Sequence, residues 1–140
     1  MINDGLRLTG ALTISLNGAI VQETNNLVVT AGKNWVADRM NDANTVMTHM
    51  ALGTGTNAAA AGDTTLQTEL DRNALSSTTV STNTIAYACT WAAGDGTGAI
   101  TEAGLFDAAS SGDMLARTVF SVVNKGASDS ITITWTITIS

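Results

Sequence analysis

The sequence has no proline, one cysteine and one histidine, and only 13% of its 140 residues are charged. The lone Cys89 excludes an intramolecular disulfide framework. Together with the lone His49 it also cannot supply the four ligands of a structural zinc site. A soluble domain has ~25% charged residues. Neutral small side chains must therefore cover much of this surface, which favours a subunit that packs closely against other chains.

Basic residues are few, and the formal net charge is −6. Phosphate binding requires clustered lysine and arginine, so we expect no nucleic-acid partner. No stretch approaches the ~18 apolar residues of a membrane span, and residues 1–4 do not open a signal peptide, so we expect no membrane partner and folding in a reducing cytoplasm. The six basic residues are scattered along the chain: Arg7, Lys33, Arg39, Arg72, Arg117 and Lys125.

Apolar residues recur at every second position in several segments, which is the period of a half-buried strand. The clearest case is residues 131–139, where isoleucine or tryptophan alternates with threonine. Residues 6–16 have the same period and end at Asn17-Gly18, a tight-turn dipeptide that predicts a hairpin with residues 19–23. The remaining predicted strands are residues 46–52, 72–81, 84–92 (joined to 72–81 near Thr82-Asn83), 99–106 and 115–123. Residues 27–29 follow a predicted loop at Asn25-Asn26.

One segment has helical rather than strand spacing. Residues 30–41 predict a short helix, with Thr30 as its N-cap and an apolar face of Trp35, Val36 and Met40 that covers the sheet. Residues 58–61 predict an extended loop and residues 64–70 a single helical turn. The chain of 140 residues fits one domain, residues 1–140. The predicted fold is an all-β antiparallel β-sandwich, or a jelly-roll-like barrel, of about seven to eight strands with one short helix.

Two segments invite a catalytic or phosphate-binding interpretation. Gly53-Thr54-Gly55-Thr56 is rich in glycine, but no lysine followed by serine or threonine comes after it, as a phosphate loop requires. A nucleophilic triad would have to use His49, and nothing else in the sequence supports one. Cys89 lies in the apolar stretch 85–92, where a cysteine is expected to be a small buried side chain.

Four acidic residues lie in or beside turns: Asp95, Glu102, Asp107 and Asp113. Their spacing matches no calcium loop, and such residues usually accept hydrogen bonds from turn backbone. Glu102 lies inside a predicted strand, where we expect an ion pair with Arg117 on the following strand. The sequence therefore predicts no catalytic residue, no cofactor-binding residue and no metal ligand, and we expect a protein that is not an enzyme.

Five segments stand out when they are taken together and in order: MALGTGT at 50–56, DTTLQTELDR at 63–72, GAITEAGLFD at 98–107, LART at 115–118 and ITITW at 131–135. In this order they resemble small virion structural proteins of tailed bacteriophages. This resemblance covers about residues 50–139 and implies a capsid decoration (cement) protein or a β-sandwich piece of a tail fibre or collar. It carries over no catalytic residue.

Among phage roles, size and charge favour a decoration protein. A tail fibre is usually long and repetitive, whereas this chain is short and opens at a plausible initiator Met1. Packaged DNA would repel its negative charge, so we expect it on the outer surface of the head, after assembly in the host cytoplasm. The expected partners are the major capsid protein or other virion proteins, and further copies of the chain, with a trimer as the first expectation. A tail-fibre, collar or adaptor component is the alternative.

A carbohydrate-binding β-sandwich module is the alternative from another class. Trp35, Trp91 and Trp135 could supply stacking faces for sugar rings. Trp91 and Trp135, however, fall on the apolar positions of their strands. We therefore expect both in the core, which favours the virion role.

Overall fold

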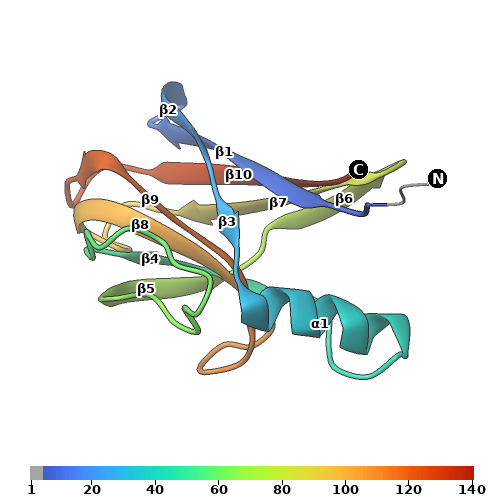
Figure 1. Ribbon diagram of the computed structural model, residues 1–140. Coiled ribbons are helices and arrows are strands. Elements are labelled where there is room, and N and C mark those ends of the chain that lie inside the picture. The colour runs from blue at the N-terminus through green and yellow to red at the C-terminus, as the bar shows by residue number, and fades with distance from the viewer. Residues whose placement is uncertain (1–4) are drawn as a thin grey trace.

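The computed structural model describes residues 5–140 as two antiparallel sheets that pack face to face, with one helix beside them (Figure 1). Sheet A has the strand order β2-β1-β10-β7-β6, and sheet B has the order β3-β9-β8-β4-β5. The predicted all-β sandwich with one short helix is confirmed. Residues 1–4, which include the predicted initiator Met1, lie outside the described residues. Within residues 5–140, no helix has the length and apolar character that crossing a membrane requires.

The sheets are built from ten strands and the helix is α1. Their bounds are β1 Leu8–Leu16, β2 Ala19–Asn25, β3 Leu27–Val28, α1 Thr30–Met40, β4 His49–Gly53, β5 Glu69–Ala74, β6 Ser77–Ser81, β7 Thr84–Trp91, β8 Gly98–Phe106, β9 Met114–Lys125 and β10 Ile131–Ile139. The Asn17-Gly18 turn has the positive φ angles, 51° and 84°, that the dipeptide predicts.

The core lies between the two sheets, and the period-two pattern predicts which side chains enter it. On β10, Ile133 and Trp135 are buried, while Thr134 between them is exposed. Leu12 of β1 and Tyr87 of β7 lie opposite Trp135 on the two neighbouring strands and are buried with it. Burying side chains of this size from water is the main stabilising contribution to such a fold.

The predicted strand over residues 72–81 is two strands in different sheets, which is one reason for the count of ten. The chain crosses between the sheets at Leu75-Ser76: Leu75 N–H donates to Thr48 O at 2.9 Å beside sheet B, and Ser76 N–H donates to Ala88 O at 2.8 Å in sheet A. Alternation along a segment reports its two faces but not the sheet of its partner strand, so the pattern could not reveal this crossing.

Helix α1 differs from its prediction at both ends. Thr30 is the first helical residue and not the N-cap; the cap position is Val29, and no side chain caps the helix. Trp35 and Val36 pack against the core as predicted, but Met40 is 84% exposed. Gly32 contacts β9 so closely that a Cβ there would lie 2.1 Å from Leu115 O, so only glycine allows this contact.

The predicted helical turn over residues 64–70 is wrong. Residues 54–68 form one long irregular segment, here called the 54–68 loop, which lies over the outer face of sheet B. Leu66 of this loop is buried against Phe106 and Met114. Strand β9 also runs two residues beyond the predicted strand over residues 115–123, since its last residue is the buried Lys125.

Candidate functional site

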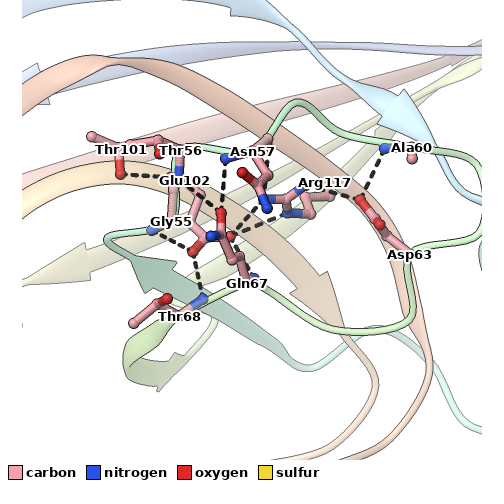
Figure 2. Close-up of polar contacts among 10 residues, drawn as sticks. All are labelled: Gly55, Thr56, Asn57, Ala60, Asp63, Gln67, Thr68, Thr101, Glu102 and Arg117. Atoms are coloured by element: carbon pink, nitrogen blue, oxygen red, sulfur yellow. Dashed lines mark hydrogen bonds and ion pairs between the residues drawn. The ribbon is translucent and has the colours of Figure 1, made fainter.

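The best-defined polar cluster of the chain lies between the outer face of sheet B and the 54–68 loop (Figure 2). At its centre, the Glu102 side chain is 0% exposed. Glu102 Oε2 accepts hydrogen bonds from the backbone N–H groups of Gly55 at 2.7 Å and Thr68 at 2.8 Å. Glu102 Oε1 accepts one from the N–H of Gln67 at 2.9 Å. One carboxylate therefore holds both ends of the loop.

Arg117 neutralises this carboxylate. Its Nε and Nη2 atoms donate to Glu102 Oε1 at 3.1 Å and 3.0 Å, and the side chain is 2% exposed. Nη1 donates to Asp63 Oδ2 at 2.9 Å, and Nη2 also donates to Asn57 O at 3.0 Å. The predicted ion pair is confirmed, but its geometry is diagonal: Arg117 lies opposite Gly104, while Glu102 lies opposite Val119, next to a β-bulge between Ile100 and Glu102.

Further side chains satisfy the backbone of the loop itself. Gln67 Oε1 accepts from the N–H groups of Thr56 at 2.9 Å and Asn57 at 2.7 Å. Asp63 Oδ2 accepts from Ala60 N–H at 2.9 Å. Covered backbone groups must be paired, and here side chains replace the partner strand that the loop lacks.

The glycines of the Gly53-Thr54-Gly55 segment make room for this carboxylate. A Cβ at Gly55 would lie 2.2 Å from Glu102 Oε2, and one at Gly53 would lie 2.7 Å from the same atom. The segment thus does what a glycine-rich anion loop does, which is to bring a backbone N–H close to an anion. Here the anion is the protein's own Glu102, which occupies the position that a phosphate would need.

The charges of the Glu102–Arg117 cluster are therefore fully used in holding the loop. Five donors surround the Glu102 carboxylate, and all three guanidinium nitrogens of Arg117 have acceptors. A general acid or base needs a proton position that a substrate can reach. Here the Glu102 carboxylate is buried and accepts hydrogen bonds from the loop backbone, so no substrate can reach it.

A second arginine connects β5 to the 107–113 turn. Arg72 Nε and Nη2 donate to the Glu69 carboxylate at 3.2 Å and 2.7 Å. Arg72 Nη1 donates to Ala108 O at 3.0 Å and Ser111 O at 2.9 Å, and the guanidinium lies 3.7 Å from the centre of the Phe106 ring. The position of Arg72 over an aromatic ring adds a cation–π contact.

Of the other acidic residues singled out in the sequence, Asp107 accepts from turn backbone as predicted, whereas Asp113 and Asp95 accept from asparagine side chains. Asp107 Oδ1 accepts from Asp113 N–H at 2.7 Å, and Asp113 Oδ2 accepts from Asn44 Nδ2 at 2.6 Å. Asp95 Oδ2 accepts from Asn73 Nδ2 at 2.8 Å. Among residues 5–140, no three histidine, cysteine or acidic side chains are grouped closely enough to hold a metal ion.

His49 and Cys89 lie in different sheets. His49 is half-buried on β4, with Nδ1 2.8 Å from Thr48 Oγ1. Cys89 is fully buried on β7, and this burial raises the pKa of its thiol to about 12. A thiol with so high a pKa is a poor nucleophile, which agrees with the predicted role of Cys89 as a small core side chain.

The two tryptophans on strands occupy the core positions that alternation along their strands predicts. Trp91 and Trp135 are fully buried. Trp135 Nε1 donates to Asn26 Oδ1 at 2.8 Å, and half-buried Trp35 donates through Nε1 to Thr45 O at 2.7 Å. Two of the three candidate stacking faces for a sugar ring are therefore inside the core.

The outer face of sheet A carries no charge on four of its five strands. Every outward position on β1, β10, β7 and β6 is threonine, serine or alanine, and none is buried. Such a face is uncharged and carries only small side chains, which suits close contact with another surface. The residues are Thr9, Ala11, Thr13 and Ser15 on β1, Thr132, Thr134, Thr136 and Thr138 on β10, Thr84, Ala86, Ala88 and Thr90 on β7, and Ser77, Thr79 and Ser81 on β6.

An apolar groove of about 520 Å³ lies between α1 and the inner face of sheet A. Its lining includes Trp35 and Val36 of α1 and Tyr87 and Ile137 of the sheet. Three exposed residues that also line it are Met40 at 84%, Val46 at 56% and Val80 at 68%. No sequence pattern predicts this groove, because its lining comes from α1 and from strands of sheet A that lie far along the chain.

Comparison of the chain with family models, with curated proteins and with solved structures finds no match.

Proposed function

We propose that this chain is a non-enzymatic structural subunit of a tailed-phage virion, a decoration protein that binds the outer surface of the head and stabilises it. The phage assignment rests on the resemblance of residues 50–139. The structural observation that supports a docking role is the neutral outer face of sheet A, because small uncharged side chains allow a second protein surface to approach with little desolvation cost.

The Glu102–Arg117 cluster also fits this role. It fixes a long loop to the sandwich through buried contacts, so the subunit is a rigid body that can be bound without ordering the loop. Binding without such ordering avoids an entropy cost. A head protein that resists internal pressure needs a stiff subunit of this kind.

The test is a binding experiment with purified heads that lack this protein. We expect the wild-type chain to bind them and to raise the temperature at which they release DNA. Thr134→Arg places a long charged side chain at the centre of the neutral face, between Thr13 and Ala88, and should abolish binding while the melting temperature of the free protein is unchanged. Asn124→Arg is the matched control, because Asn124 is an exposed residue of β9 in the other sheet. This variant should bind like the wild type.

Heads that release DNA at the same temperature with and without the bound protein would show that the stabilising role is wrong. Binding that survives Thr134→Arg would exclude the outer face of sheet A as the docking surface.

A further inference from the structure

The four edge strands of the two sheets differ in how they are protected from pairing with another strand. Edge strands are usually protected by charge, bulges or short length. β3 has two residues, β5 carries Glu69, Asp71 and Arg72, and β2 carries Glu23 and pairs with β1 through a bulge. β6, with the sequence STTVS, has none of these features, and all five residues are exposed.

The region around β6 is also free of charge. The chain from Ala74 to Trp91, which contains β6, its turn and β7, has no acidic, basic or histidine residue. Two copies of a protein with net charge −6 repel each other, and a neutral edge is where they can meet with the least repulsion. One side of β6 is paired with β7, and its other side ends sheet A, so its outward N–H and C=O groups form a template on which another strand can pair.

The apolar groove adjoins this edge. Thr78 and Val80, the inward-facing residues of β6, line the groove together with Met40 and Val46. A strand added beside β6 would extend sheet A over the groove and cover the apolar side chains of Val80, Met40 and Val46. Backbone pairing and burial of alternate side chains are the two components of recognition by strand addition.

We propose that β6 pairs with β6 of a second copy of this chain. The two strands run antiparallel, and the twofold axis passes between Thr79 of one copy and Thr79 of the other. This register places Val80 of each copy opposite Thr78 of the other, on the groove side. The two grooves then join beneath one continuous sheet, and the two α1 helices lie on the same side of it. The twofold pair is isologous, so every contact is made twice.

The size of the contact sets the expected strength. A standard interface takes ~800 Å² from each partner, and a ladder of five residues supplies only part of this area. The exposed groove residues Met40, Val46 and Val80 supply the apolar remainder. We therefore expect a dimer that dissociates in roughly the micromolar range. The pairing is independent of the phage role, since it requires only the purified chain.

The first test is sedimentation velocity of the full chain over a wide concentration range. The wild type should pass from monomer to dimer. Val80→Lys places a charge on the groove side of the edge and should weaken dimerisation at least ~100-fold, with an unchanged melting temperature. Val122→Lys is the matched control, because Val122 is 51% exposed on β9, and this variant should dimerise like the wild type.

The second test reports the register directly. Paired Cα atoms in an antiparallel ladder lie ~4.5–5.5 Å apart, within the range that a disulfide spans. Thr79→Cys treated with copper–phenanthroline as oxidant should give a covalent dimer that dithiothreitol reverses. Val21→Cys, on the other edge of sheet A, should stay monomeric under the same conditions.

Three results would overturn the proposal: a wild type that is monomeric at every concentration, equal dimerisation of Val80→Lys and Val122→Lys, or equal cross-linking of the two cysteine variants. Failure of head binding would leave these results unaffected, so the two proposals fail separately.

Discussion

Glu102 Oε1 lies 3.0 Å from Arg117 Nη2, and the two side chains are 0% and 2% exposed. Buried ion pairs repay their desolvation only when further hydrogen bonds complete them. Here the backbone N–H groups of Gly55, Gln67 and Thr68 do so on the carboxylate side. The pair therefore links the sheet to the 54–68 loop. Substitutions at Glu102, Gly55 and Asp71, and labelling of Cys89, should have measurable effects.

Glu102→Gln should lower the free energy of unfolding by about 3–5 kcal/mol, because it removes the fully buried partner of Arg117, leaves only the Asp63 carboxylate beside it, and turns an amide NH₂ toward N–H donors. Urea denaturation followed by tryptophan fluorescence measures the loss. Glu69→Gln removes the partner of Arg72 at a side chain that is 36% exposed and should cost less than about 1 kcal/mol. Equal losses in the two variants would show that the buried ion pair contributes no more to stability than the exposed one.

Gly55→Ala should destabilise the protein by about 1–3 kcal/mol, because the added Cβ overlaps Glu102 Oε2 and Gln67 Cβ. It should also make the 54–68 loop sensitive to limited proteolysis. Gly62 lies in the same loop, and a Cβ there meets nothing within 4 Å. Gly62→Ala should therefore leave stability unchanged or raise it by up to about 1 kcal/mol. A Gly55→Ala protein as stable and protease-resistant as Gly62→Ala would contradict the packing.

Asp71→Asn should stabilise the protein at neutral pH. Burial, and then the neighbouring Asp95 carboxyl, raise the pKa of Asp71 above its ordinary value of 3.8. An acid with a raised pKa in the folded state favours folding when protonated, and this contribution is lost as the pH rises through the folded pKa. The variant should therefore exceed the wild type by less than about 1 kcal/mol at pH 7.

The stability difference at Asp71 should disappear below pH 3.8, where the wild-type carboxyl is also neutral. Thermal melts across a pH series measure it. Asp42→Asn is the control, since the Asp42 side chain is 97% exposed and its removal should change stability at pH 7 by less than about 0.5 kcal/mol. A wild type that is more stable than Asp71→Asn at pH 7 would show that the Asp71 charge is favourable.

Cys89 should not react with thiol reagents in the folded protein. With a pKa of about 12, only on the order of 1 in 10,000 thiols is ionised at pH 8, and the side chain is buried. Labelling should follow the rate of unfolding and accelerate in urea. In Thr79→Cys, one thiol should label at once and the other only on unfolding; immediate labelling of both would place Cys89 within reach of solvent.

Much of the fold follows from period-two alternation, because one buried face is what each strand contributes to a sandwich. This pattern predicts the burial of Trp91, Trp135 and Cys89, while the Asn17-Gly18 turn follows from its dipeptide. It cannot predict the crossing at Leu75-Ser76, because sheet membership depends on the partner strand. The Met40 exposure and the groove were missed for a related reason: helical spacing predicts an apolar face but not how far the helix reaches along the sheet.

The buried contacts of the 54–68 loop were only partly predictable. A carboxylate inside an apolar strand signals that Glu102 needs a cation, and Arg117 was the nearest basic residue along the chain. The three backbone donors on Glu102 belong to an irregular segment, whose path depends on many weak contacts rather than on a repeating pattern. The glycines at 53 and 55 were the available signal, and they mark a close approach of the backbone to an anion.

The position of β10 between β1 and β7 determines when sheet A can be completed as the chain is synthesised. β10 follows all nine other strands in sequence, yet both of its neighbours in sheet A depend on it for hydrogen bonds. Until residues up to Ile139 have emerged, β1 and β7 cannot be joined, and Leu12 and Tyr87 have no tryptophan to pack against. Nascent chains therefore pass through an interval in which sheet A is incomplete and chaperones can bind them.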